Sequence, residues 1–386
     1  MPDYVDSSAL REFRAAAATL VNPSLQEWKD QGGKVVGCMY HFIPEEIITA
    51  AGLLPYRMRA TGSTGTELAE SRFTQVNCTF VRHLFDSGMR CDQDFLDGVV
   101  SVNNCDHVRR LYDNWKAAIP ASYMHFMVFP KKSGSEQVEA YRHELAGFKS
   151  SLEEHFQVQI TDEKLRAAIQ LHNQIRGLQR RLYDLRRSDA SPITGADVLA
   201  VMVAGTCMPM ERYNSLLRQL LEECGRAEGP RDHVARLMVM GGEIDDPGLI
   251  EAFESERGLV VVDSLGYGYR SCAKDVAVDG DPLTALARYQ VMERPADPRL
   301  FGRTTEERDE YLSSLIEPFR VEGVIAVRLL QCDHWGFEQS NLAKYFRKRQ
   351  IPYLALEIEY VLSGVGQIKT RVQAFLERIT EARNAR

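Results

Sequence analysis

Two segments of the sequence each run from a Val- and Ile-rich stretch directly into Cys-Asp-His. They are GVVSVNNCDH (residues 98–107, with Cys105) and GVIAVRLLQCDH (residues 323–334, with Cys332). A third cysteine, Cys78, stands in TQVNCTFVRHLFD, a segment whose pattern predicts a helix. Thiolates bind both zinc and iron–sulfur clusters, and a helix N-terminus lowers the pKa of a thiol. Three such cysteines predict a metal site, but their spacing suits zinc and an iron–sulfur cluster equally well.

A plainer interpretation assigns both segments to strand–helix junctions in which Asp106 and Asp333 cap the helices. It explains the aspartates but not the repeated cysteine, because a cap needs no thiol. The chain has eight cysteines and no CxxC pair, so neither a zinc ribbon nor a disulfide framework is expected. Cys38 follows the first predicted strand and is expected to line the site or to be a buried apolar residue.

Titratable side chains close to the first predicted strand suggest acid–base chemistry. His41 and Glu46 are the candidate catalytic residues, because an imidazole or a carboxylate can move protons during a reaction. The alternative for Glu46 is a structural role, since the helix dipole favours Glu in a first turn. His107 and His334 are expected either to hydrogen-bond to cluster sulfurs or to face solvent.

Eight short apolar segments are predicted strands, alternating with helical patterns. The predicted strands are residues 33–40, 53–60, 96–102, 122–130, 234–242, 258–265, 323–330 and 351–359. Helices are expected at residues 44–52, 75–86, 106–115, 193–204, 209–224 and 335–349, with others starting near Thr161 and Pro247, two between residues 282 and 318, and a last one carrying Ile368 to Ile379. Continuous apolar strands between helices indicate parallel sheets covered on both faces.

The predicted fold is therefore α/β, with two Rossmann- or flavodoxin-like domains joined by a helical region. The expected divisions are an N-terminal domain at 1–150 with Cys78 and Cys105, a helical connector at 151–228, and a C-terminal domain at 229–386 with Cys332. Ligands of such sheets bind beyond the carboxyl ends of the strands. Cys105 and Cys332 are expected there, at equivalent positions of two similar domains.

Composition excludes several classes of function. The 386 residues carry a net charge of −7, which gives no general attraction to nucleic acid or an anionic membrane. No apolar run reaches the length of a membrane span, and the N-terminus lacks the pattern of a signal peptide. The expected location is the cytoplasm.

Six segments resemble successive landmarks of the 2-hydroxyacyl-CoA dehydratase / benzoyl-CoA reductase family, in the family's order and over almost the whole chain. They are VGCMYHFIPEEIITAAGLLPYRM, VNCTFVRHLFD, NNCDHVRRLYDNW, QCDHWGFE, RQIPYLALEIEY and GQIKTRVQAFLE. The resemblance implies a [4Fe–4S] cluster, held by Cys78, Cys105 and Cys332 near an acyl-CoA thioester. It also implies a related second cluster-bearing subunit and a separate ATP-hydrolysing iron–sulfur activator. The lack of a GxxxxGK[ST] loop agrees with an ATPase on another chain.

The tail and the length are most similar to the smaller, C or gamma, subunit of ATP-dependent benzoyl-CoA reductase. The expected function is therefore reductive dearomatisation of benzoyl-CoA or a similar aromatic acyl-CoA, driven by the activator. One alternative is a subunit of an (R)-2-hydroxyacyl-CoA dehydratase, which eliminates water through a ketyl radical. Two further alternatives are a zinc-binding protein with the same three cysteines and a non-catalytic partner subunit that relays electrons.

Overall fold

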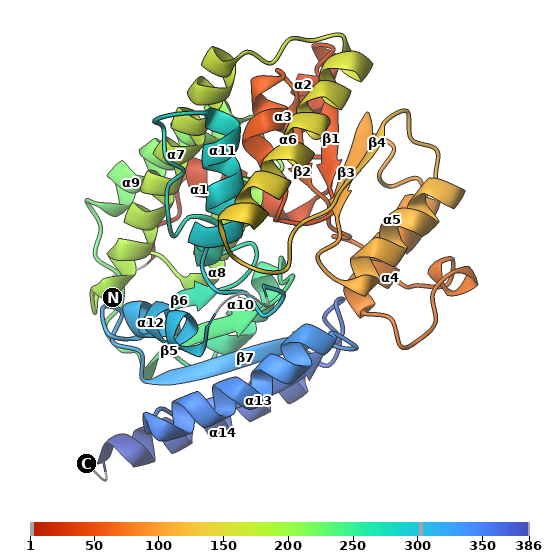
Figure 1. Cartoon of the computed structure of the whole chain (residues 1–386). Coiled ribbons are helices and arrows are strands. Elements are labelled where there is room, and N and C mark those ends of the chain that lie inside the picture. Colours follow the sequence, from red (N-terminus) through yellow and green to blue (C-terminus); the bar gives the residue numbers. More distant parts are fainter. Residues whose placement is uncertain (1–3, 301–303, 385–386) are drawn as a thin grey trace.

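Two four-stranded parallel sheets form the framework of the protein (Figure 1). The computed structural model describes residues 4–300 and 304–384. The first sheet consists of β1 (Val35–Cys38), β2 (Leu54–Arg57), β3 (Gly98–Val102) and β4 (Met124–Met127). The second consists of β5 (Ala235–Gly241), β6 (Gly258–Ser264), β7 (Gly323–Leu329) and β8 (Tyr353–Ile358). All eight predicted strands and the predicted α/β fold class are confirmed. We call the parts of the chain around these sheets the N-terminal and C-terminal halves.

The two sheets share one topology. Their strand orders are β2-β1-β3-β4 and β6-β5-β7-β8, with every pair parallel. In each sheet the chain moves first to one side of the first strand and then to the other. The point of reversal lies between β1 and β3, and between β5 and β7, which is where open α/β sheets bind ligands. Cys105 and Cys332 follow β3 and β7, so they occupy equivalent places in the two halves, as expected.

Fourteen α-helices among the described residues surround the sheets. They are α1 (Ser8–Ala18), α2 (Pro23–Asp30), α3 (Glu45–Ala50), α4 (Thr79–Met89), α5 (Asp106–Ala118), α6 (Ser135–Phe156), α7 (Asp162–Asp184), α8 (Gly195–Ala204), α9 (Met210–Cys224), α10 (Pro247–Glu254), α11 (Pro282–Arg288), α12 (Thr305–Ile316), α13 (Asp333–Lys348) and α14 (Val365–Asn384). Helices α1, α2 and α6 lie outside the predicted ones. The signal for α6 is nonetheless present, because its buried residues Val138, Tyr141, Leu145, Phe148 and Leu152 recur at helical spacing.

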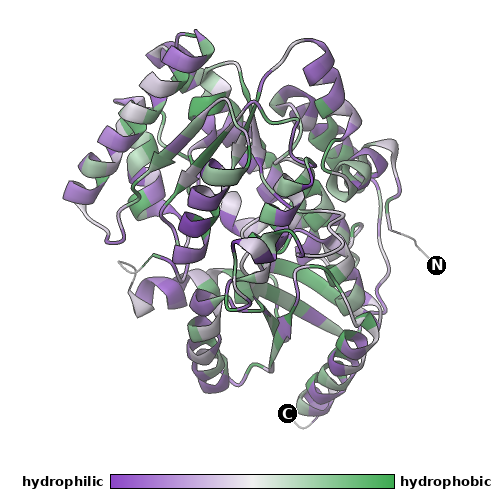
Figure 2. Ribbon diagram, turned by 90° about the vertical axis from the view of Figure 1, so that its right-hand side faces the viewer, coloured by the Kyte–Doolittle hydropathy of each residue, from purple (hydrophilic) through white to green (hydrophobic). Residues whose placement is uncertain are grey.

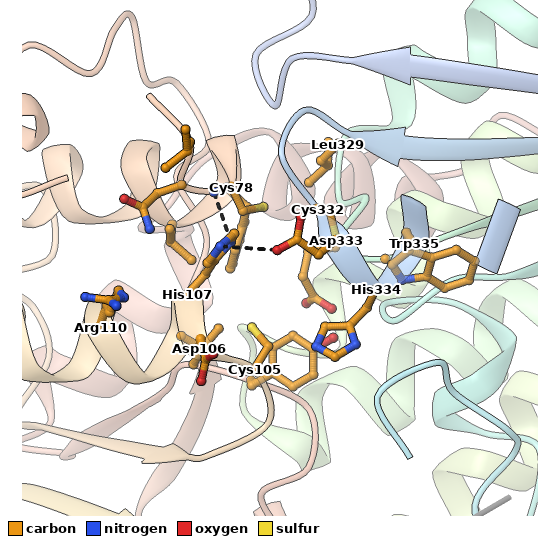
Figure 3. A pocket seen from close by; sticks show the side chains of 18 of the residues that line it. Cys78, Cys105, Asp106, His107, Arg110, Leu329, Cys332, Asp333, His334 and Trp335 are labelled. Carbon is orange, nitrogen blue, oxygen red and sulfur yellow. Dashed lines mark hydrogen bonds and ion pairs between the residues drawn. The ribbon is translucent and has the colours of Figure 1, made fainter. Parts of the chain in front are cut away.

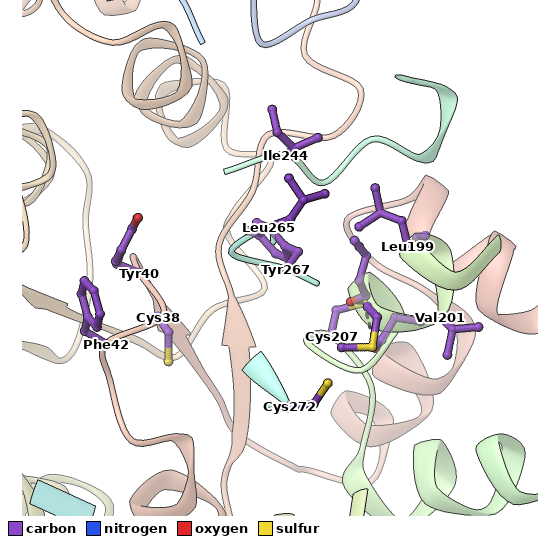
Figure 4. Packing of buried hydrophobic residues seen from close by; sticks show 14 of the residues in the cluster. Cys38, Tyr40, Phe42, Leu199, Val201, Cys207, Ile244, Leu265, Tyr267 and Cys272 are labelled. Carbon is purple, nitrogen blue, oxygen red and sulfur yellow. Dashed lines mark hydrogen bonds between the residues drawn. The ribbon is translucent and has the colours of Figure 1, made fainter. Parts of the chain in front are cut away.

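Hydrophobic residues concentrate in the strands, while the outer helices carry hydrophilic faces (Figure 2). Every residue of β1, β3, β5 and β6 is buried, as continuous apolar strands require. The eight cysteines are all free. Cys38, Cys207 and Cys272 belong to the buried core (Figure 4). None of the described helices combines the length and the hydropathy that a bilayer crossing demands.

The helices between the two sheets contact both halves of the chain. Helix α7 packs against α3, and α8 packs against α10 and β6. The predicted boundary at residue 150 falls inside α6, and the one at residue 229 falls in the loop between α9 and β5. The division into three parts stays a prediction.

Candidate functional site

Cys78, Cys105 and Cys332 line one cavity of about 470 Å³ (Figure 3). Cys78 and Cys105 come from the N-terminal half, and Cys332 comes from the C-terminal half. Both halves therefore contribute to the cavity wall. The structure brings together the three cysteines that were expected to meet.

Each of these cysteines is the N-cap of a helix. Cys78 precedes α4, Cys105 precedes α5 and Cys332 precedes α13, and none of the three side chains makes a capping hydrogen bond. The prediction that Asp106 and Asp333 cap these helices is wrong. Both are the first residue of their helix, where the dipole favours a negative charge without any capping bond. Three helix N-termini thus point their positive ends at the cavity.

The three thiols differ in how readily they ionise. A hydrogen bond from the Cys78 thiol lowers the pKa of Cys332, and the same bond, with burial, raises the pKa of Cys78. Burial raises the pKa of Cys105 to about 12, although main-chain N–H groups of α5 oppose the shift. A lowered pKa is therefore found only at Cys332, where the Cys78 thiol is the main cause and a main-chain N–H of α13 adds to it. A metal would be needed to ionise the other two.

His107 connects the segments that carry the cysteines. Its Nδ1 accepts a hydrogen bond of 3.0 Å from the main-chain N–H of Cys78, and its Nε2 lies 3.8 Å from Oδ2 of Asp333 (Figure 3). Because Nδ1 accepts, the proton of the neutral ring is on Nε2. Burial lowers the pKa of His107, which favours that neutral form. Its ring thus orients the cysteine backbone, a role that the sequence did not indicate. His334 also lines the cavity.

Thr79 ties the beginning of α4 to the C-terminal half. Its main-chain N–H donates to the carbonyl oxygen of Leu330 at 3.2 Å. Its hydroxyl donates to Oε2 of Glu359 at 2.5 Å. Leu330 lies two residues before Cys332 and Thr79 follows Cys78, so this clasp of Thr79, Leu330 and Glu359 sets where the two cysteines stand relative to each other.

A buried arginine forms part of the cavity wall. Arg299 makes two hydrogen bonds of 2.6 Å to the Asp297 carboxylate, and its guanidinium lies 4.4 Å from the ring centre of Tyr40. Burial lowers the pKa of Arg299 to about 9, which still leaves it charged at neutral pH. The sequence carries no signal that would have selected Arg299. The sequence does carry a signal for Glu243, another residue of the cavity wall. Glu243 follows two glycines at the carboxyl end of β5, where ligands of such sheets bind.

The remaining wall is partly apolar and its edge is partly basic. Trp335 is buried and lines the cavity, whereas Phe337 is 78% exposed and belongs to neither the wall nor the core. Arg72 and Arg110 also line the cavity and are exposed.

Glu46 lies away from the cysteine cavity. It is buried in an ion pair with Arg176 and lines a second, smaller cavity of about 70 Å³ together with His172. Burial alone would raise the pKa of Glu46, but the Arg176 charge outweighs it and lowers the pKa to about 2. A carboxylate ionised so firmly is a poor proton donor at neutral pH.

His41 lies behind the cavity wall, between two carboxylates. Its Nδ1 is 3.3 Å from Oε1 of Glu243, and its Nε2 is 3.7 Å from Oδ2 of Asp297. His41 also lines the smaller cavity. Cys38 is fully buried and lines neither cavity, in agreement with the apolar alternative.

Within the described part of the chain, no group of three or more His, Cys, Asp or Glu side chains is arranged to hold a metal ion. This finding applies equally to a zinc ion and to an iron–sulfur cluster.

Known proteins are similar to this chain over most of its length. The family model for 2-hydroxyglutaryl-CoA dehydratase, D-component, matches residues 40–379, a range that includes the three cavity cysteines. The C subunit of the benzoyl-CoA reductase of Thauera aromatica is 27% identical over 361 residues, which cover 92% of this chain and 93% of that protein. The beta subunit of (R)-2-hydroxyglutaryl-CoA dehydratase from Acidaminococcus fermentans is 26% identical over 386 residues (97% and 99%). The (R)-phenyllactyl-CoA dehydratase beta subunit of Clostridium sporogenes is 22% identical over 364 residues (92% and 94%).

Proposed function

Because the chain belongs to the 2-hydroxyglutaryl-CoA dehydratase D-component family, we propose that it is the iron–sulfur subunit of a radical acyl-CoA enzyme. Cys78, Cys105 and Cys332 would hold a [4Fe–4S] cluster. The observation that carries this proposal is the meeting of these three cysteines, from both halves of the chain, around one cavity. A related second subunit and an ATP-hydrolysing activator would complete the enzyme. The subunit names of its relatives support an assembly of several chains.

The donor set fits an iron–sulfur cluster. Cysteine thiolates are the usual ligands of [4Fe–4S] clusters. A cluster is several atoms across, and the cavity of about 470 Å³ that the three cysteines line is large enough for one. Only Cys332 has a lowered pKa, so binding of the cluster itself would have to ionise the thiols of Cys78 and Cys105. When bound, the cluster would supply single electrons at low potential.

The residues of this chain would prepare the cavity for an acyl-CoA. Trp335 and its apolar neighbours exclude water from the thioester, which strengthens the electrostatic interactions inside. The Arg299 guanidinium supplies a fixed positive charge at the wall. The exposed Arg72 and Arg110 would bind phosphate groups of CoA.

The substrate we favour is benzoyl-CoA or a similar aromatic acyl-CoA, reduced at its ring. The 27% identity to a benzoyl-CoA reductase subunit over 92% of the chain supports it. The second candidate is the elimination of water from a 2-hydroxyacyl-CoA, supported by the family model and by the dehydratase beta subunits. In both reactions an acyl-CoA accepts one electron at its thioester.

Metal analysis of anaerobically purified protein tests the cluster. We expect about four irons and four sulfides per chain, with a brown absorption spectrum. Cys105→Ser should lose them, whereas Cys91→Ser, which changes an exposed cysteine outside the cavity, should retain them. Zinc in place of iron, or equal iron in both variants, would refute the proposal.

Turnover then separates the two reactions. The chain, combined with its partner subunit and the activator, is given benzoyl-CoA and 2-hydroxyacyl-CoA in parallel. Loss of the aromatic absorption identifies the reductase, and an enoyl-CoA product identifies the dehydratase. A loaded cluster without either reaction would favour the electron-relay alternative.

A further inference from the structure

Glu243 and His41 occupy matching places in the two halves of the chain. His41 lies in the loop after β1 and Glu243 in the loop after β5, the first strand of each sheet. Both loops lie beside the reversal of strand order, where ligands bind. Glu243 lines the cysteine cavity, while His41 lines the smaller cavity. The two side chains therefore form the partition between the cavities.

The facing atoms of this pair make no hydrogen bond within the described part of the chain, although Oε1 of Glu243 has a further charged neighbour in Nη1 of Arg299, at 3.7 Å. Nδ1 of His41 and Oε1 of Glu243 are 3.3 Å apart, and both atoms are buried without a hydrogen bond within the described residues. Leaving a buried donor or acceptor unpaired costs stability, so native proteins retain few of them. Long contacts of this kind are common in substrate-free active sites and shorten in the working complex.

Gly266 provides the space in which the pair meets. A Cβ atom at this position would come within 2.8 Å of Oε1 of Glu243 and 3.3 Å of Nδ1 of His41. It would also lie 3.2 Å from the carbonyl oxygen of Gly242. Any larger residue would therefore push the two side chains apart.

Asp297 stands on the opposite side of the imidazole. Its Oδ2 lies 3.7 Å from Nε2 of His41 and 3.4 Å from Nη1 of Arg270, while Arg299 binds both of its oxygens. Burial would raise the pKa of Asp297, but Arg270 and His41 together outweigh it and lower the pKa, which favours the anion. An anion there holds the Nε2 proton of the ring toward itself, which turns Nδ1 toward Glu243.

We propose that Asp297, His41 and Glu243 form a proton relay into the cysteine cavity. Glu243 exchanges protons with the bound acyl-CoA, His41 resupplies Glu243, and Asp297 positions His41. The inference rests on the proposed function, since reduction of a ring consumes protons and loss of a hydroxyl group as water requires one. It assigns the proton supply to residues that line or adjoin the cavity, and it gives no part to Glu46.

Charge and protons balance in each step. The Glu243 carboxylic acid gives its proton to the reacting acyl-CoA and becomes a carboxylate. The Nδ1 proton of the His41 imidazolium then crosses to Oε1 of Glu243, which leaves neutral imidazole and restores the acid. Nε2 keeps its proton toward Asp297, and Nδ1 regains one that solvent delivers through water in the smaller cavity, which His41 lines; the volume of about 70 Å³ and the charged lining of this cavity suit ordered water.

Three variants test the relay in the assembled enzyme. Glu243→Gln and His41→Gln remove the exchangeable protons, and Gly266→Ala separates the pair while keeping both groups. We expect the turnover of acyl-CoA to fall by about 10²- to 10³-fold in Glu243→Gln and His41→Gln. Turnover should also fall in Gly266→Ala. Iron and sulfide content should stay at the wild-type level. The control is Glu251→Gln, an exposed glutamate on α10 that lines a different cavity.

A second readout does not depend on turnover. In ¹⁵N-histidine-labelled protein, the shifts of the two ring nitrogens report which of them carry protons, and His41→Gln assigns the signals. We expect Glu243→Gln and Gly266→Ala to change the Nδ1 signal of His41, and Asp297→Asn to change the Nε2 signal. Unchanged signals, or turnover within twofold of wild type in Glu243→Gln, would overturn the relay. Wild-type enzyme that converts neither acyl-CoA would instead refute the proposed function, while the nitrogen signals would still decide whether the relay exists.

Discussion

The main-chain N–H of Thr79 donates a hydrogen bond to the carbonyl oxygen of Leu330 at 3.2 Å. This bond joins the first residue of α4 to the segment that follows β7. Cys78 and Cys332 flank it on the two sides. The Thr79 hydroxyl adds a bond to Glu359, so the clasp is made by one residue of the N-terminal half and two of the C-terminal half.

Removing the Thr79 hydroxyl should loosen the clasp. Thr79→Val keeps the side-chain shape but leaves the partly buried Glu359 carboxylate without its donor. We expect the free energy of unfolding to fall by about 1–3 kcal/mol, as for other buried acceptors that lose a partner. Urea titration measures it. Thr380→Val is the matched control, because the hydroxyl of Thr380 bonds only within α14. Equal losses of unfolding free energy in Thr79→Val and Thr380→Val would show that the bond from Thr79 to Glu359 does not stabilise the fold.

His107 should matter for metal retention. His107→Phe leaves the N–H of Cys78 without its acceptor and frees the backbone of a proposed ligand. Loss of such supporting groups weakens metal binding by about 10–100-fold in other proteins. We therefore expect a chelator to remove iron from this variant faster than from the wild type by a factor in that range. His143→Phe, on the exposed face of α6, should lose iron at the wild-type rate. Similar rates for both variants would contradict the prediction.

The ion pair of Glu46 and Arg176 predicts a dependence of stability on pH. The pKa of Glu46 is lowered from 4.5 to about 2, so its contribution is present above pH 4.5 and is lost as the pH falls through 2. At pH 7, Glu46→Gln leaves Arg176 without its ion-pair partner. We expect the free energy of unfolding to fall by about 3–5 kcal/mol. The difference between variant and wild type should narrow below pH 4.5.

Urea unfolding of Glu46→Gln and of the wild type between pH 3 and pH 7 measures this difference in unfolding free energy. Glu139→Gln is the control, since the Glu139 ion pair is exposed on α6 and should contribute little at any pH. A difference for Glu46→Gln that stays constant down to pH 3 would show that ionisation of Glu46 is not what stabilises the fold.

Asp245 predicts a dependence of stability on pH with the opposite sign. Burial raises its pKa from 3.8 to about 6, while the hydroxyl of Tyr360 donates to its Oδ2 at 2.8 Å. The raised pKa means that stability is full below pH 3.8 and falls as the pH rises through 6. Asp245→Asn retains an acceptor for Tyr360 and carries no charge. At pH 8 the free energy of unfolding of this variant should therefore exceed that of the wild type by roughly 3 kcal/mol. The figure follows from about 1.4 kcal/mol for each unit of difference in pKa.

Thermal or urea unfolding at pH 4 and pH 8 tests this prediction. The gain of Asp245→Asn should appear at pH 8 and vanish at pH 4. Asp279→Asn changes an exposed aspartate and should differ little from the wild type at both values. A variant that is less stable than the wild type at pH 8 would mean that the Asp245 charge supports the fold.

Much of the fold could be predicted because local periodicity records burial. Strands covered on both faces must be continuously apolar, so β5 and β6 are visible in the sequence. The rule that ligands bind beyond strand ends then selected Cys105 and Cys332, and the resemblance of several segments identified the family. Helix α6 was missed although its apolar spacing is regular.

What only the tertiary structure decided depends on how the two halves meet. Cys78 reaches Cys332 because the clasp joins α4 to the end of β7, and no local pattern encodes that contact. Glu46 is directed to Arg176 because α3 packs against α7, so a candidate chosen by its neighbours in sequence became a structural ion pair. Arg299 and Glu243 reach the cavity from separate loops. Periodicity reports which residues are buried, whereas partnership between buried charges is set by distances through space, which a linear pattern does not contain.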